Sequence, residues 1–311
     1  MRLSLVVLVT MSHQVISLAQ GIGTYAFLRN DVSARAAALN GSFVSMVNDP
    51  NVVFYNPAAL TTVEKPSGSI GFLKHLMDVN AGNISFSQYA EGIGNIGAGI
   101  TFISYGTFTQ TDQFLNNLGS FGATEFALVA GAATPLDGES SIGANVKVIY
   151  SSIANYRSSA MAIDLGYLYT IPSENITIGA SILNIGRQLS TYAGVREPLP
   201  LDVKIGITKR PEHLPVFLNV NFHKLNESQE SVFQRLNSFS FGAEFLMSES
   251  VRFRVGYSNE QRKELKLGTS AGLAGFSLGG GILSGDYRFD YAFNSYGKIG
   301  ALHRVSLGTT F

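Results

Sequence analysis

The stretch from Tyr287 to Phe311 constrains the fold most, because its side chains alternate between apolar and polar residues. Successive side chains of a β-strand point to opposite faces, so this pattern predicts two strands with one aromatic face and one polar face. Such strands suit the closing seam of a membrane barrel, although a soluble β-sandwich with one wet face would show the same alternation. The first of these strands places on one face Tyr287, Phe289, Tyr291 and Phe293, and on the other Arg288, Asp290 and Asn294.

Alternation of this kind recurs along the chain from about residue 67. Many of the candidate strands exceed the five or six residues usual in globular proteins, and they reach the length that a tilted strand needs to cross a bilayer. The fourteen candidates cover 67–76, 80–90, 94–106, 122–134, 139–152, 157–171, 174–185, 200–210, 213–224, 237–247, 250–259, 271–283, 285–296 and 300–311.

The links between these strands separate the barrel from the sandwich. Tight turns such as 135–138, 172–174 and 284–286 alternate with longer links at 106–122, 186–200, 224–236 and 259–270. Bacterial barrels have short periplasmic turns and longer exterior loops, whereas a sandwich has no reason to sort its loops in this way. The sequence therefore predicts an all-β, 14-stranded antiparallel transmembrane barrel in the outer membrane, with both termini periplasmic.

Composition excludes several other classes of protein. No internal run of 18 apolar residues is present, so a membrane-spanning helix is not expected. The zero net charge and the lack of a basic cluster argue against a nucleic-acid partner. The glycine-rich motif at 92–97 and the Gly-x-Ser-x-Gly motif at 275–279 both continue as strands, where neither dinucleotide binding nor a nucleophile elbow is expected. We expect no enzyme activity, no catalytic residues, no cofactor and no metal site.

The N-terminal region precedes the strands and divides into two parts. Residues 1–19 have a positive start, an apolar stretch and a small-x-small site ending at Ala19, which predicts a signal peptide; a buried N-terminal helix is the alternative. Residues 20–64 are expected to form a compact, mostly non-strand segment, with a helix over 31–39 capped by Asp31 and stopped by Gly41. Residues 65–311 then form the barrel.

The polar face of the predicted strands carries charged residues. On the lipid face, each Arg or Lys in the middle of the bilayer would cost about 2–4 kcal/mol. We therefore place them in the lumen as a structural network of ion pairs. The alternative is that Arg252, Arg254 and Arg304 line a binding surface. The main members of the predicted network are Asp164, Arg252, Arg254, Arg288, Asp290 and Arg304, and the same parity also carries Lys147, Lys204, His223 and Glu244.

Several segments carry a resemblance to a known family. They are 33–39, the Asn56-Pro57-Ala58 motif with the two residues that follow it, 185–189, 196–200, 290–297 and 303–307. With the signal peptide and fourteen strands, they make the chain resemble the FadL-like outer-membrane barrels and, more closely, the PorQ barrels of the type IX secretion system of Bacteroidota. The resemblance spans nearly the whole mature chain and implies that the N-terminal segment is a plug inside the barrel, where Asn56 would satisfy backbone groups.

The resemblance also implies a role in a surface attachment complex. Its partners would be a PorZ-like surface protein, a sortase and a PorV-like barrel, and the complex would join secreted cargo to anionic lipopolysaccharide. Phe311 would serve barrel assembly. Two alternatives stay open: a FadL-type channel for hydrophobic small molecules, with a lateral opening where the glycines at 92, 94, 97 and 99 bend a strand, and a PorV-like cargo shuttle. Candidate docking residues in the long links are Arg187, Arg196, Lys224, Glu227, Glu230, Arg235, Arg262 and Lys263.

Overall fold

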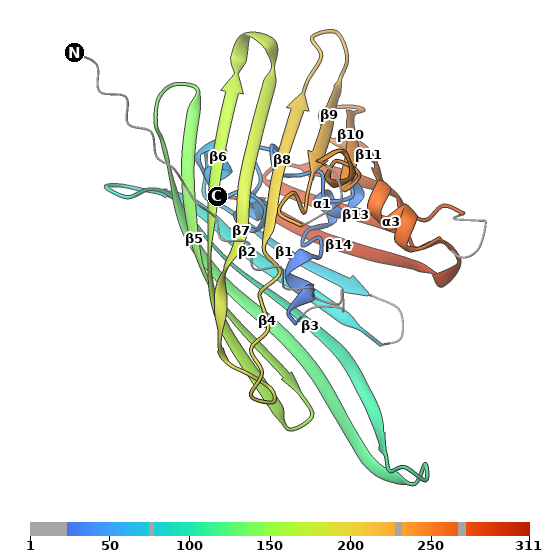
Figure 1. The fold of residues 1–311 in the computed structure, drawn as a ribbon. Coiled ribbons are helices and arrows are strands. Elements are labelled where there is room, and N and C mark those ends of the chain that lie inside the picture. Colours follow the sequence, from blue (N-terminus) through green and yellow to red (C-terminus); the bar gives the residue numbers. More distant parts are fainter. Residues whose placement is uncertain (1–23, 75–77, 228–231, 267–271) are drawn as a thin grey trace.

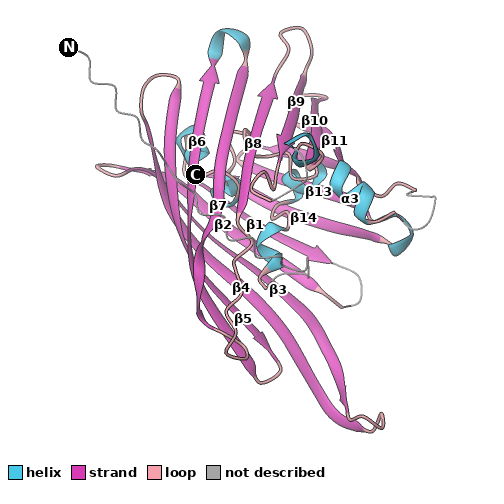
Figure 2. Ribbon diagram, in the orientation of Figure 1, coloured by secondary structure: helices cyan, strands magenta, loops and turns pink. Residues whose placement is uncertain are grey.

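A computed structural model describes residues 24–74, 78–227, 232–266 and 272–311. These residues form fourteen antiparallel strands, each paired with the next, and β1 pairs with β14 to close the barrel (Figures 1 and 2). The predicted fold class is confirmed. The strands are β1 (Ser67–Lys74), β2 (Asn80–Ala90), β3 (Gly94–Thr111), β4 (Asn117–Pro135), β5 (Ser140–Ile153), β6 (Tyr156–Ile171), β7 (Ile176–Ser190), β8 (Asp202–Lys209), β9 (Val216–Phe222), β10 (Phe239–Leu246), β11 (Val251–Ser258), β12 (Phe276–Ser284), β13 (Tyr287–Ser295) and β14 (Ala301–Thr310).

The outer face of the wall is apolar and the inner face is buried against the plug. In β4, for example, Phe126 and Leu128 point outward and are exposed, whereas Ala127 and Val129 point inward and are buried. A closed barrel pairs the backbone groups of every strand, which is the condition for placing a sheet in lipid. The exposed apolar face therefore identifies the wall as membrane-spanning. No helix among the described residues is long and apolar enough to span a membrane.

The two ends of the barrel differ. The links 91–93, 136–139, 172–175, 210–215, 247–250 and 285–286 lie at the end where β1 begins and β14 finishes, and this is called the short-turn end below. The opposite end, called the loop end, carries the longer links 191–201, 223–238 and 259–275. These three long links agree with the sequence pattern.

One predicted long link is wrong. Residues 106–122 are mostly strand, because β3 and β4 continue past the bilayer-length segment and only 112–116 connect them. A bulge between Ser104 and Thr107 shifts the register, and the Phe108 and Phe121 rings stack across the extended pair with centroids 5.4 Å apart. In Figure 1 this hairpin projects well beyond the neighbouring strands. β7 also runs on to Ser190, so Arg187 lies on a strand and not in a loop.

The N-terminal segment fills the barrel as a chain of short helical turns, η1 (Ala26–Arg29), α1 (Ala34–Ala38), η2 (Pro50–Phe54) and η3 (Pro57–Thr62). The predicted helix is shorter than expected, because its N-cap is Ser33, whose Oγ accepts from the backbone N–H of Ala36 at 3.2 Å. Asp31 is therefore not the cap. Gly41 ends the helix as predicted, with a φ of +71° and its N–H bonded to the carbonyl of Ala36. The predicted signal peptide lies outside the described residues.

Glycines on the inner wall make room for the plug. A Cβ on Gly97 would lie 2.5 Å from the Leu60 side chain, and one on Gly99 would lie 2.3 Å from the Phe54 ring. β3 pairs without a register shift with β2 over 94–104 and with β4 over 95–104, so its pairing is continuous past these glycines. The glycines are needed for close packing, and in this stretch they open no gap in the wall.

Candidate functional site

A closed ring of alternating charges ties the plug to the wall near the short-turn end. Arg35 and Asp49 come from the plug, and the other members come from β10, β11 and β13. Three guanidinium groups and three carboxylates balance, so the buried ring carries no net charge. Its contacts are Asp49–Arg35 at 3.2 Å, Arg35–Glu244 at 2.8 Å, Glu244–Arg254 at 2.5 Å, Arg254–Asp290 at 2.7 Å, Asp290–Arg288 at 2.8 Å and Arg288–Asp49 at 2.6 Å.

The ring contains both predicted and unpredicted members. Arg254, Arg288 and Asp290 belong to the lumen network proposed from the strand alternation, whereas Arg35 and Asp49 were missed. Strand parity marks inward-facing wall residues, but it gives no signal for a plug made of short turns. The arginine inside the Ala-rich segment 34–38 was the one available clue to the plug members of the ring. A buried helix of alanines rarely carries an arginine without a charged partner.

Three other residues of the predicted network lie apart from the ring. Asp164 pairs with Lys147 at 3.0 Å farther round the wall and accepts a hydrogen bond from the backbone N–H of Asn184. Arg304 lines a cavity described below. Arg252 was predicted to belong to the network, but its guanidinium donates to the backbone carbonyls of Ser248 and Val251 at the short-turn end. Among the described residues it forms no ion pair with a lumen carboxylate.

The Asn56-Pro57-Ala58 motif fixes the plug against β6. Asn56 is fully buried, and its Nδ2 donates to the carbonyls of Val44 at 2.9 Å and Tyr167 at 3.0 Å. Its Oδ1 accepts from the backbone N–H of Ala58 at 3.1 Å and so caps η3. One amide side chain therefore satisfies two backbone carbonyls and one N–H that the barrel interior removes from water.

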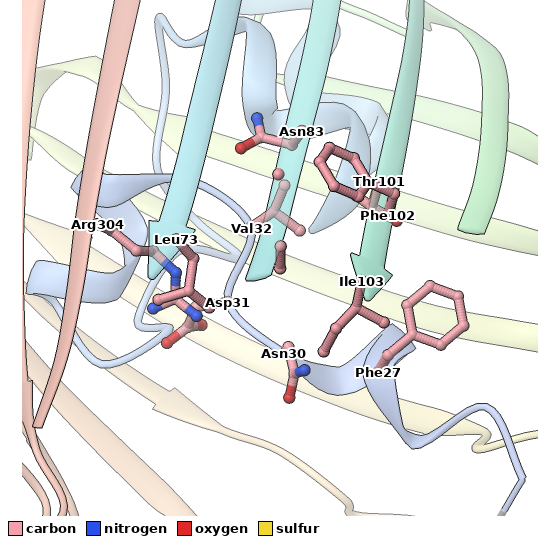
Figure 3. Close-up of a pocket in the computed structure, with 12 residues that line it drawn as sticks. Phe27, Asn30, Asp31, Val32, Leu73, Asn83, Thr101, Phe102, Ile103 and Arg304 are labelled. Carbon is pink, nitrogen blue, oxygen red and sulfur yellow. The ribbon is translucent and has the colours of Figure 1, made fainter. Parts of the chain in front are cut away.

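A polar cavity of about 270 Å³ lies between the plug and the wall at the loop end. Arg304 and Asp31 line it, and they also line an adjoining space of about 30 Å³ in which Figure 3 shows their charged groups facing each other. Arg304 donates to Asn294 Oδ1 at 3.4 Å. The cavity presents both signs of charge, so it favours water and polar solutes over apolar ones.

The rim of the polar cavity is held by ion pairs between loops. Glu260, in α3 (Asn259–Glu264), contacts Lys224 at 2.6 Å and His223 at 2.8 Å. Burial raises the pKa of the Glu260 carboxyl, but hydrogen bonds from these two basic residues outweigh it and hold that pKa at about 2. Glu227 pairs with Arg29 of the plug at 2.9 Å. These contacts link the loops to each other and to the plug.

The remaining candidate docking residues are dispersed over the loop end. Arg187 and Arg196 are exposed, as is Lys263. Arg262 is half-buried over the Phe276 ring, with its Nη1 donating to the carbonyl of Gly272 at 3.2 Å. Arg235 is half-buried at the end of α2 (Val232–Arg235), and Glu230 lies outside the described residues. The structure does not bring these side chains together as one surface.

A second cavity, of about 330 Å³, opens at the loop end between the start of the plug and β3, β4 and β5; it is called the aromatic cavity below. Sequence reasoning missed it, because it depends on the β3–β4 extension and on the position of Tyr192 in the 191–201 link. In the part of the chain that the structure describes, no group of His, Asp and Glu is arranged to hold a metal ion. The aromatic cavity is lined by Thr24, Tyr25, Ala26, Tyr105, Phe108, Ala123, Glu125, Ser151, Ser152, Ile153 and Tyr192.

No family model matches the sequence, and no curated protein is similar to it. The fold is nevertheless similar to solved barrels. The toluene transporter TodX of P. putida superposes with a TM-score of 0.61 at 13% identity, covering 90% of this chain and 98% of that one. The monoaromatic hydrocarbon channel CymD gives 0.60 at 12%, covering 90% and 97%, and a Pseudomonas aeruginosa FadL homologue gives 0.56 at 10%, covering 90% and 98%. The chain therefore has a FadL/TodX-like barrel fold.

Proposed function

We propose that this protein is an outer-membrane barrel that binds small hydrophobic molecules at its loop end, as the first step of FadL-type uptake. The aromatic cavity is the observation that carries the proposal. Its volume of about 330 Å³ is roughly twice that of a buried apolar cavity known to take up benzene, so a substituted aromatic ring would fit. TodX is a toluene transporter and CymD a monoaromatic hydrocarbon channel, and their similar fold supports small aromatic molecules as the proposed class of ligand.

The orientation follows the general rule for outer-membrane barrels. With the short-turn end in the periplasm, the loop end and its two cavities face the exterior. A hydrophobic molecule would then enter the aromatic cavity from outside without crossing the plug. We assign no catalytic step to this site.

Passage beyond the cavity requires the plug to move, because the short helical turns fill the lumen and the ring of charges holds them. Leu39, Val52 and Leu60 of the plug are fully buried. In this proposal the cavity selects the molecule, and the ring sets the free energy needed to release the plug.

The test is a gene deletion complemented by two variants. We expect the deletion to slow uptake of toluene, wild type to restore it, and Ala123→Phe, which fills the aromatic cavity, not to restore it. Ala301→Phe, on the half-buried first position of β14 and away from the cavity, is the matched control and should restore uptake. Equal uptake in the deletion strain and wild type, with barrel levels verified, would refute the proposal.

A second candidate function is the attachment-complex role of PorQ-like barrels, in which the barrel holds a PorZ-like protein, a sortase and a PorV-like barrel at the outer leaflet. A sealed lumen favours it, since an anchor needs no passage: the plug is packed into the glycine-lined wall and closed by the charge ring. A cargo-shuttle role like that of PorV would use the same surface.

The same deletion strain separates the two functions. The attachment role requires secreted surface proteins to appear in the medium or periplasm while uptake of hydrophobic compounds is intact. Glu227→Lys should then weaken recovery of the partner, because the change breaks the ion pair between the 223–238 link and Arg29 of the plug. Lys263→Glu, at an exposed position, tests whether a charge change elsewhere at the loop end also weakens recovery of the partner. Correctly attached surface proteins in the deletion strain would exclude this function.

A further inference from the structure

The aromatic cavity contains one acidic side chain, Glu125, which sits on the inner face of β4 and is 9% exposed. Tyr105 Oη donates to its Oε2 at 2.6 Å, and Ser151 Oγ donates to its Oε1 at 2.9 Å. Both oxygens therefore accept from neutral hydroxyls, as an ionised carboxylate does. Among the described residues, Glu125 takes part in no ion pair with a Lys, Arg or His side chain.

This situation differs from that of the other buried acids. Asp49, Glu244 and Asp290 are each paired with arginines in the ring, and Asp164 is paired with Lys147. A buried carboxylate normally requires such a partner. Glu125 has only hydroxyls, and two accepted hydrogen bonds leave a carboxylate with lone pairs to spare.

The cavity walls around Glu125 are rich in aromatic rings. Four aromatic rings line the cavity, those of Tyr25, Tyr105, Phe108 and Tyr192. The face of an aromatic ring carries partial negative charge and attracts cations, which is how aromatic cages recognise substituted ammonium groups. Burial raises the pKa of the Tyr192 phenol, a hydrogen bond with Ser151 lowers it, and the nearby carboxylates of Glu125 and Glu197 add to the rise.

We propose that the aromatic cavity binds amphiphilic cations, molecules in which an ammonium group adjoins an aromatic or alkyl body. The ammonium would be the missing partner of the Glu125 carboxylate and would lie among the four aromatic rings, and the apolar body would contact Ala123 and Ile153. This inference rests on the proposed function and narrows it, since it names the charge of the molecules that the cavity prefers. An anionic amphiphile such as a fatty acid would be repelled.

The test uses three probes of similar size, 2-phenylethylammonium, 2-phenylethanol and 3-phenylpropanoate, titrated by calorimetry into the full-length barrel in non-ionic detergent. We expect the ammonium probe to bind at least about tenfold more tightly than the alcohol, and the carboxylate probe to bind most weakly. Glu125→Gln should abolish the preference for the ammonium probe, so that the ammonium and the alcohol bind this variant with equal affinity. Glu139→Gln is the matched control, because Glu139 also accepts from a tyrosine, Tyr169, but lies at the short-turn end.

The outcomes distinguish a failure of the cation inference from a failure of the proposed hydrophobic binding site. Equal binding of the ammonium probe and the alcohol, or an ammonium preference that survives Glu125→Gln, would overturn the cation inference and leave the hydrophobic site intact. Binding of none of the three probes would overturn both. If Glu125→Gln does not fold, Phe108→Leu gives the answer: it should weaken ammonium binding several-fold more than alcohol binding, and an equal loss for both probes would overturn the inference.

Discussion

Replacing Arg254 with methionine should destabilise the barrel by about 3–5 kcal/mol, because it removes one partner from a buried, fully paired ring. Arg254 is 1% exposed and contacts Glu244 at 2.5 Å and Asp290 at 2.7 Å. Without it the ring has two cations for three carboxylates, and the excess negative charge is buried. The free energy of unfolding can be measured with urea in lipid vesicles, following tyrosine fluorescence and heat-modifiable gel mobility, since the chain has no tryptophan.

Two further variants test the reasoning behind this value. Arg252→Met, two residues away on the same strand, removes a guanidinium whose hydrogen bonds within the described residues go to the backbone carbonyls of Ser248 and Val251, and it should cost less than about 1 kcal/mol. The double variant Arg254→Met with Asp290→Asn restores charge balance and should recover part of the loss, giving a coupling energy in a double-mutant cycle. An Arg254→Met loss no larger than that of Arg252→Met would refute the view that the ring depends on balanced charge.

Three other changes test separate parts of the molecule. Gly99→Val should cost about 1–3 kcal/mol because its side chain would overlap the Phe54 ring, and adding Phe54→Ala should recover part of it, as urea unfolding would show. Deleting Phe311 removes an N–H that donates to Pro66 at the β1–β14 seam, so less heat-modifiable barrel should reach the outer membrane. The pKa of Glu260 in the folded protein, about 2, lies below its ordinary value of 4.5. The stability it contributes is therefore present above about pH 4.5 and lost as the pH falls toward 2, and hydrogen exchange of α3 should accelerate over that range less in Glu260→Gln than in wild type.

The wall of the barrel could be predicted from the sequence because its rule is local. Alternation with period 2 marks each strand without knowledge of its neighbours, and the short turns fix the pairing of successive strands. The extension of β3 and β4 could not be predicted in this way, since Gly106 and Gly122 resemble loop boundaries. The strand pairing over 107–111 and the stacking of Phe108 on Phe121 show that the strands continue.

The sites were less predictable because they depend on contacts between distant segments. Arg254 and Asp290 could be placed in the lumen by parity, but their bond to each other and the link through Asp49 depend on the path of the plug. The packing role of the β3 glycines could not be predicted for the same reason, since a glycine that bends a strand and one that makes room for a side chain look identical in sequence. Glu125 lies on the inner parity of β4, yet its hydroxyl partners come from β3 and β5.

The central claim, that the loop end holds a hydrophobic binding site, is tested most directly with a fluorescent reporter. Because the protein has no tryptophan, Phe108→Trp would place a single indole in the wall of the aromatic cavity. Titration with toluene should change its emission saturably, and the change should disappear when Ala123→Phe is added. A reporter that does not respond to toluene, or that responds equally with the cavity filled, would contradict the proposed function.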